Sequence, residues 1–337
     1  MVAEYVTTGP PILDIRYDSG PSNEDPLAEA LLSQNGYLPK ELAYEGKGME
    51  IWTEIAKDSY QTKHELEIIN ETAGDIVERF RTGATIIDLG AADSQKYVPF
   101  VKAFLRDGEI CTYTPLDLNP VSLEKHVLSV RNSYTKDHQI PCVGLWGTFI
   151  HGDKYYHRIK GQRLFLSLGG IFFNAPDRMC HARLKEFDEQ LRPGDVLLVG
   201  QDGPTSRADL ELADKAYKTE AYHRFVDNYL EFLGKRAGIE VVKHVREYWD
   251  VDSLSPPGKH YFKITARVDM VCTNLDNFKI EAGISYEMFP SWKRTYEDIK
   301  RLVSKHDLDV TLHCKSPRSG MCQYLIQKKE KQPSVVA

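Results

Sequence analysis

The chain has 337 residues, of which 42% are hydrophobic and 27% charged, and its formal net charge at pH 7 is −6. This length predicts one large domain or two ordinary ones, and an acidic balance without a long basic stretch disfavours a dedicated nucleic-acid binder. No stretch approaches the roughly 20 apolar residues of a membrane span. The first residues lack a secretory signal, and six scattered cysteines without a Cys-x-x-Cys pair favour a cytoplasmic protein without a metal.

The first 205 residues predict helices followed by a βαβ alternation. Apolar spacing predicts helices over 27–34, 48–57 and 62–81. Strands are then expected at 85–89, 110–116, 142–145, 163–168 and 195–199, separated by helices at 96–106, 120–132 and 179–191. Such a rhythm predicts an α/β fold with a doubly wound, Rossmann-like parallel sheet.

The rhythm changes after residue 205. Helices are expected within 210–234, antiparallel strands within 241–251 and 260–274, a helix over 291–306, and a closing hairpin from 310–313 and 323–327. We therefore predict two discontinuous domains. One comprises 66–205 plus 285–330 and binds the cofactor; the other, an α+β domain of 1–65 plus 206–284, binds the substrate.

Two predicted strands end in an acidic residue. Asp88-Leu89-Gly90 closes the first, and Asp117 follows about 25 residues later at the end of the next. Glycine lets a ligand approach the backbone, and the second acid can accept both ribose hydroxyls of a nucleotide-like cofactor. Because Ala91 and Ala92 follow a single glycine, S-adenosylmethionine (SAM) fits at least as well as a dinucleotide. An ordinary strand-end turn is the alternative.

Short blocks in a fixed order resemble a known family. They include Tyr60-Gln61-Thr62 followed by Glu65, and Asp88-Leu89-Gly90 followed by Lys96; the series covers residues 12–16, 38–48, 60–65, 88–96, 116–118, 144–149, 168–174 and 197–202. The chain resembles the histidine α-N-methyltransferases of ergothioneine biosynthesis, and more closely their fungal relatives, the dimethylallyltryptophan N-methyltransferases of ergot alkaloid pathways. The resemblance implies SAM-dependent methylation of an amine in fungal secondary metabolism, typically the α-amino group of an amino acid.

The resemblance also implies a cofactor site. Asp88 and Gly90 would belong to the cofactor-binding turn, with Gly90 against the methionine part of SAM, and Lys96 would pair with the methionine carboxylate. Asp117 would hold the ribose, and the adenine would be bordered by Thr148 and Phe149. Two of these residues have a structural alternative: Asp117 as the cap of the helix from Pro120, and Lys96 as a solvated charge.

The implied substrate site is less complete. Tyr60 is expected to position the amine, with Asp202 as a second catalytic candidate, because an oxygen near the amine can accept its proton. The remaining substrate-binding residues are expected to be Tyr44, Gly169, Asn174, Leu212 and Glu281.

Several substitutions depart from the family pattern on the substrate side. Leu212 stands where the family has a carboxylate-binding tyrosine, Gly283 where it has a serine, and Phe173 where it has a glycine. Histidine itself is therefore not expected as the substrate. Asn174 has an alternative role as the cap of the helix that follows Pro176.

Other functions stay open at this point. The chain could methylate an amine without a carboxylate, or a hydroxyl, or it could be a catalytically silent SAM-binding partner subunit. The expected partner is a small-molecule amine, not nucleic acid or a membrane, and the expected state is a monomer or homodimer.

Overall fold

A computed structural model describes residues 9–16, 26–33, 38–80, 82–91, 95–109, 111–134, 140–240 and 244–330. The chain divides into two compact units. Unit 1 comprises Met1–Asp18, His64–Gly203 and Arg294–Ala337, and unit 2 comprises Ser19–Lys63 and Pro204–Lys293. Each unit is discontinuous in sequence. The assignment of cofactor to one unit and substrate to the other stays a prediction.

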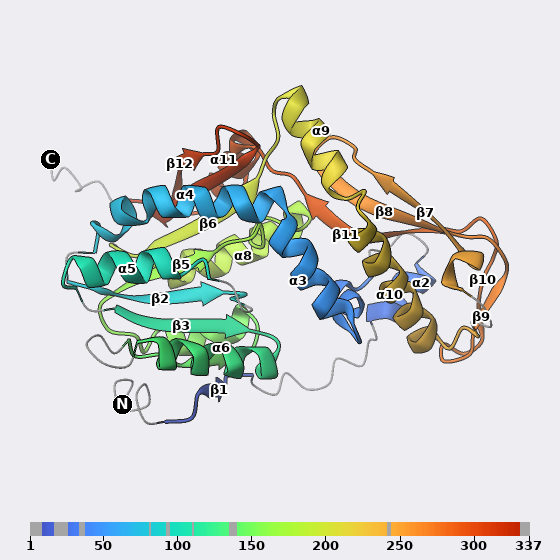
Figure 1. The fold of residues 1–337 in the computed structure, drawn as a ribbon, viewed down its shortest axis with the longest axis horizontal. Helices are drawn as coiled ribbons and strands as arrows, with labels where there is room; N and C mark the ends of the chain where they lie inside the picture. The colour runs from blue at the N-terminus through green and yellow to red at the C-terminus, as the bar shows by residue number, and fades with distance from the viewer. Residues whose placement is uncertain are drawn as a thin grey trace, which may run out of the picture. The chain divides into compact units, whose positions relative to one another are not determined.

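Unit 1 is built on an eight-stranded sheet of order β1-β4-β3-β2-β5-β6-β13-β12 (Figure 1). The strands from β1 to β6 are parallel to their neighbours, and β13 runs antiparallel to β6 and β12. Their bounds are β1 Ile12–Asp14, β2 Ala84–Leu89, β3 Cys111–Asp117, β4 Gly144–Trp146, β5 Gln162–Ser167, β6 Val196–Asp202, β12 Leu308–Lys315 and β13 Met321–Lys328. From β2 the chain builds outward through β3 and later returns to add β5 on the other side, which is a doubly wound order. The predicted α/β, Rossmann-like fold is confirmed.

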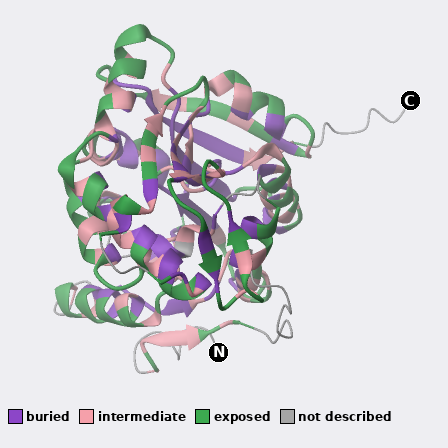
Figure 2. Ribbon diagram, turned by 90° about the vertical axis from the view of Figure 1, so that its right-hand side faces the viewer, coloured by how far each residue is buried: buried purple, intermediate pink, exposed green. Residues whose placement is uncertain are grey.

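Helices cover both faces of this sheet. Side chains of α4, α5 and α6 pack in one core cluster, and those of α8 and α11 pack in a second. Alternate residues of a strand enter different clusters, as Leu197 and Leu198 of β6 do, because successive side chains point to opposite faces. Figure 2 shows the central strands largely buried and the helices exposed along their outer faces. The helices are α4 Tyr60–Val77, α5 Val98–Arg106, α6 Pro120–Ser133, η2 Ile150–Gly152, α7 Asp153–Tyr156, α8 Asp177–Gln190 and α11 Tyr296–Val303.

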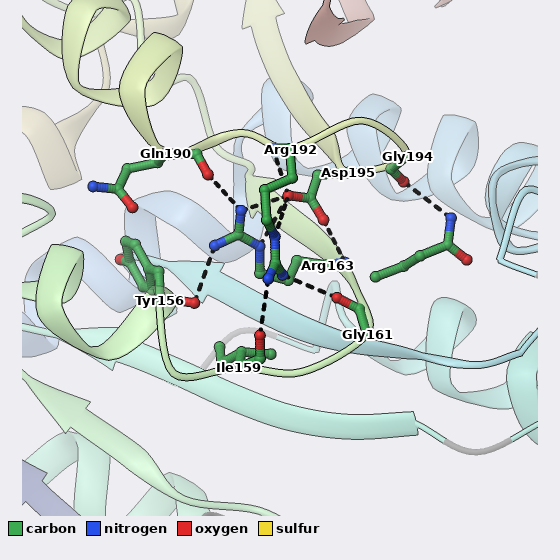
Figure 3. A network of polar contacts seen from close by, with 9 residues as sticks. Tyr156, Ile159, Gly161, Arg163, Gln190, Arg192, Gly194 and Asp195 are labelled. Carbon is green, nitrogen blue, oxygen red and sulfur yellow. Dashed lines mark hydrogen bonds and ion pairs between the residues drawn. The ribbon is translucent and has the colours of Figure 1, made fainter.

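A buried ion pair fastens β5 to the start of β6 (Figure 3). Arg163 is fully buried, and its guanidinium contacts the Asp195 carboxylate at 2.9 Å through Nε and 2.5 Å through Nη2. The remaining guanidinium N–H groups donate to the backbone carbonyls of Tyr156 and Gln190. Burying a charge costs free energy unless its hydrogen bonds are satisfied. Here the Arg163 guanidinium donates to the Asp195 carboxylate and to two backbone carbonyls.

Unit 2 packs helices on a small antiparallel sheet of order β11-β8-β7, with a separate β10-β9 ribbon. Its core includes Phe225, Tyr229 and Leu233 from one face of α10, together with Phe262 and Ile264 from β8. The helices are α2 Pro26–Leu32, η1 Lys40–Tyr44, α3 Gly48–Asp58, α9 Arg207–Ala216, α10 Glu220–Ala237 and η3 Val245–Glu247. The strands are β7 Trp249–Leu254, β8 Lys259–Ala266, β9 Met270–Cys272, β10 Phe278–Ile280 and β11 Ser285–Trp292.

Three strands, β1, β10 and β11, were not predicted from the sequence. Ile12–Asp14 pairs in parallel with Gly144–Trp146, so the described N-terminal residues join the sheet of unit 1. Ser285–Trp292 pairs with β8 in unit 2, and the predicted helix over 291–306 was therefore wrong at its start. The helix begins only after Thr295, whose side chain and that of Asp298 form a capping box.

Candidate active site

The predicted cofactor residues gather at one edge of the sheet in unit 1. β2, β3, β4, β5 and β6 run parallel, so their carboxyl ends share an edge. Asp88, Asp117 and Asp202 lie at strand ends, and the other predicted residues of this unit lie in the loops that follow. In a doubly wound sheet this is the edge at which ligands bind.

Gly90 lies in the turn after β2, and Asp88 lies in the strand just before it. Gly90 has a φ of +73° and donates its N–H to the Leu116 carbonyl at 2.8 Å. A Cβ at Gly90 would lie 2.8 Å from Cδ1 of Ile171, so the position is both conformationally and sterically suited to glycine. Asp88 instead lies buried and accepts a hydrogen bond from the Tyr113 hydroxyl at 2.9 Å; burial raises the pKa of Asp88 to about 7.

Asp117 is partly buried at the end of β3. Its Oδ1 accepts from the backbone N–H of Asn119 at 3.0 Å, and its carbonyl accepts from Gly147 N–H at 3.1 Å. The cap of α6 is Asn119, whose side chain accepts from Val121 and Ser122 N–H groups. The structure therefore gives the capping role to Asn119 rather than to Asp117.

Thr148 and Phe149 follow the short strand β4. The backbone N–H of Thr148 donates to Nδ1 of His151 at 3.0 Å, and Phe149 precedes the 3-10 turn at 150–152. The nearby Trp146 ring is covered by the Arg16 guanidinium, 3.2 Å from the ring centre. The Arg16 guanidinium therefore covers one face of the Trp146 ring in a cation–π contact.

Lys96 contacts Glu65, which the sequence places in one of the family blocks but to which it assigned no role. Its Nζ lies 2.6 Å from Oε2 of Glu65, a side chain only 1% exposed. Both Glu65 oxygens also accept from the backbone N–H of Gly169, at 2.9 Å each. Lys96 is therefore held at this edge, and the alternative of a solvated helix charge is wrong. Glu65 falls on the buried face of α4 with Ile69, Thr72 and Ile76, and an acid in that stripe was the signal for it.

Asn174 and Asp202 lie near the ends of β5 and β6. Asn174 is partly buried and does not cap α8, whose cap position is Pro176 without a side-chain hydrogen bond. Asp202 is 4% exposed, and its carbonyl accepts from the backbone N–H of Arg294 at 3.1 Å. Phe173, which stands where the family has a glycine, is fully buried in the core of unit 1.

Arg294 was not predicted from the sequence as a residue of this edge. Its buried guanidinium donates to the Ala175 carbonyl at 2.7 Å and pairs with Asp177 at 2.8 Å. It thereby ties the loop after β5 to the end of β6. The signal was weak, because Arg294 falls within the helix predicted over 291–306, where an arginine is ordinarily a surface charge.

The predicted residues of unit 2 come from separate elements. Tyr44 ends η1 and packs edge-on against Trp52, with ring centres 5.8 Å apart. Tyr60 begins α4, and Leu212 lies partly buried on α9. Glu281 is exposed in the turn after β10.

Unit 2 also buries a polar cluster that the sequence did not reveal. The Lys293 ammonium donates to the Tyr217 hydroxyl at 2.8 Å, and that hydroxyl donates to Ser291 Oγ at 2.7 Å. The Tyr217 ring stacks on His260, with centres 3.6 Å apart. Burial lowers the pKa of His260 to about 3, with a smaller contribution from Lys293. The cluster joins α9, β8 and β11, which are far apart in sequence.

The class of protein follows from this edge and from a family comparison. A model described as "Histidine-specific methyltransferase, SAM-dependent" matches residues 23–328. The protein class is thus the SAM-dependent methyltransferases, and SAM is the cofactor of the class. The chain belongs to the histidine-specific methyltransferase family, which confirms the predicted family.

Curated relatives match at lower coverage. Ergothioneine biosynthesis protein 1 of Neurospora crassa is 29% identical over 74% of this chain and 29% of its own length. A 4-dimethylallyltryptophan N-methyltransferase of Penicillium roqueforti is 29% identical over 44% of each chain. The histidine N-alpha-methyltransferase of Mycobacterium tuberculosis is 25% identical over 49% of this chain and 50% of its own. The matches thus span at most half the length of these relatives.

No helix within the described ranges is long and apolar enough to cross a membrane.

Proposed function

We propose that this chain is a SAM-dependent N-methyltransferase acting on the α-amino group of an amino acid or an amino-acid-derived metabolite. The carboxyl edge of unit 1 carries the proposal, because it assembles the Gly90 turn, the Asp117 carboxylate and the Lys96 ammonium on adjacent segments. Two of the relatives are named for 4-dimethylallyltryptophan or histidine, which favours a tryptophan- or histidine-type acceptor and brings back histidine, which the substitutions on the substrate side had disfavoured. We also propose a role in fungal secondary metabolism, in the cytoplasm.

The cofactor roles follow from the chemistry of each position. Gly90 admits the methionine part close to the backbone, and Lys96 pairs with its carboxylate. Asp117 accepts the ribose hydroxyls, while Thr148 and Phe149 border the adenine. Asp88, being buried, acts by supporting the turn.

The acceptor must be held as a neutral amine in line with the methyl group. SAM supplies that methyl on a sulfonium, and alignment alone can lower the barrier by several kcal/mol, up to about 7–11 in model reactions. Tyr60 positions the amine and accepts a hydrogen bond from it, with Asp202 as the second candidate. The other proposed acceptor contacts are Tyr44, Gly169, Asn174, Leu212 and Glu281.

A titration with SAM, followed by mass analysis of an acceptor panel, tests the proposal. The panel contains histidine, tryptophan, a prenylated tryptophan, and tryptamine as an amine without a carboxylate. We expect SAM binding and a gain of about 14 Da per methyl on an amino acid, since a methyl replaces one hydrogen. Asp117→Ala should weaken SAM binding by about 1–3 kcal/mol through its lost ribose hydrogen bonds. Asp107→Ala is the control, because its carboxylate pairs with the neighbouring Arg106 after α5.

The other outcomes separate the competing functions. Methylation of tryptamine alone would indicate an acceptor without a carboxylate, which the Leu212 substitution favours. SAM binding without methylation of any acceptor would indicate a silent binding subunit. Absence of SAM binding would overturn the proposal.

A further inference from the structure

Glu65 is a carboxylate buried in unit 1 with two partners that both belong to the cofactor edge. It lies on α4 and is 1% exposed. Its oxygens accept from the Gly169 N–H at 2.9 Å, and Oε2 accepts from the Lys96 ammonium at 2.6 Å. A carboxylate with so little access to water is stable only when such donors replace its hydration.

The neighbouring strand leaves space for this carboxylate. Gly200 lies in β6 between the buried residues Val199 and Gln201, and a Cβ there would lie 1.7 Å from Oε1 of Glu65. Gly200 has no positive φ, so its backbone conformation does not call for glycine. A glycine inside a buried strand marks a close approach by another group, and here that group is the Glu65 side chain. Four segments therefore meet at one carboxylate: α4, the turn before α5, the loop after β5, and β6.

We propose that Glu65 is a positioning residue for the cofactor, a role that rests on the function proposed above. It fixes the Lys96 ammonium at the sheet edge and fixes the loop that begins at Gly169. An ammonium carries three donors, so a lysine held by Glu65 can also meet a ligand carboxylate. A lysine side chain loses considerable rotamer freedom when it binds, and prior fixation reduces that cost for the ligand.

Glu65→Gln tests this role while keeping the size of the side chain. A glutamine has one acceptor oxygen, and its NH₂ group would face either the Gly169 N–H or the Lys96 ammonium. We expect about tenfold weaker SAM binding and a raised KM for SAM, with kcat changed by less than about twofold. Because Gly169 is also a proposed acceptor contact, the KM of the acceptor should rise too, but less than the KM for SAM. Glu67→Gln is the matched control. It lies on the same helix in an ion pair with Arg318 that is about half exposed, and its SAM affinity should match the wild type.

A double-mutant cycle distinguishes positioning from a general structural effect. In a Lys96→Met background, Glu65→Gln should cost clearly less SAM affinity than in the wild type, because the coupling through Lys96 is gone. Equal losses in the two backgrounds, or unchanged SAM affinity in Glu65→Gln, would overturn the role. If the wild type binds SAM and Lys96→Met binds it equally well, the proposed role of Lys96 fails instead.

Hydrogen exchange on the wild-type protein covers the case in which Glu65→Gln does not fold. The Gly169 amide should exchange slowly with and without S-adenosylhomocysteine, because a buried carboxylate accepts from it. Fast, loop-like exchange at Gly169 would contradict the anchoring contact even if SAM binds. If Gly169 exchanges slowly but the protein binds no SAM, the contact between Gly169 and Glu65 is supported and the proposed role of Glu65 toward the cofactor is not.

Discussion

Units 1 and 2 both bury ionisable side chains, but they neutralise them differently. In unit 1 the buried acids Glu65 and Asp195 contact cations, Lys96 and Arg163. In unit 2 the Lys293 ammonium donates to a tyrosine hydroxyl, and His260 is buried beside it. The difference shows that unit 1 holds its charges in ion pairs, whereas the core of unit 2 favours a neutral base.

The two units should also respond to pH in opposite directions. In unit 1, burial raises the pKa of Asp88 to about 7, so the folded state prefers the protonated acid. In unit 2, burial lowers the pKa of His260 to about 3, so the folded state prefers the unprotonated base. Rising pH therefore lowers the free energy of unfolding through Asp88, and falling pH lowers it through His260.

Removing the fully buried Arg163 guanidinium of unit 1 should have the largest effect. Arg163→Met leaves the Asp195 carboxylate buried without its main cation, and we expect a loss of about 3–5 kcal/mol in the free energy of unfolding. Denaturant titrations followed by hydrogen-exchange mass spectrometry would assign the loss to peptides of unit 1. The matched change in unit 2 is Arg224→Met, which breaks an ion pair with Glu54 that is about half exposed. Arg224→Met should lower the free energy of unfolding by less than about 1 kcal/mol. An equal loss in Arg163→Met and Arg224→Met would contradict the contrast between the buried and the exposed ion pair.

The alternation of strands and helices made the sheet of unit 1 predictable. Buried β-branched strands such as β2 are recognisable from local composition, and so was the hairpin of β12 and β13. The three residues of β1 carry no such signal, because their partner at Gly144–Trp146 is more than 100 residues away. β11 was mistaken in part for a helix because the Thr295 capping box that starts α11 lies just beyond it.

The candidate site was predictable only where it depends on strand ends. Gly90 and Asp117 follow local strand signals, so their edge could be located from sequence. Glu65 could not be assigned a partner, because Gly169 is 104 residues away. The Tyr217–Lys293 contact spans 76 residues and depends on how β11 pairs, which no local pattern reports.

Changing His260 should alter the acid side of the stability profile. An ordinary histidine pKa of 6.5 in the unfolded chain and about 3 in the folded protein means that stability falls as pH drops below 6.5. The loss should approach about 1.4 kcal/mol per pH unit, or about 2 kcal/mol between pH 6.5 and 5. His260→Gln should flatten this part of the curve, measured by urea unfolding with a probe in unit 2. His223→Gln, at an exposed ion pair on α10, is the control and should keep the wild-type slope.

Changing Asp88 should have a smaller effect of the opposite sign. The folded pKa of about 7 lies above the ordinary 3.8, so its contribution to stability is fully present below 3.8 and declines as pH rises toward 7. Between pH 5.5 and 6.5 the decline should be about 1.4 kcal/mol. Asp88→Asn keeps an acceptor for the Tyr113 hydroxyl and removes the titrating group. The free energy of unfolding of the variant should therefore rise relative to that of the wild type as the pH increases from 5.5 to 6.5.

A SAM titration on the same Asp88→Asn protein decides what the buried acid does for the site. If Asp88 acts only by supporting the Gly90 turn, the amide should preserve SAM affinity within about twofold while the pH slope changes, because the hydrogen bond to Tyr113 remains. A tenfold loss of SAM affinity with an unchanged slope would mean that the carboxylate faces the ligand and not the core. The two measurements therefore place Asp88 either in the core that shapes the edge or in direct contact with the cofactor.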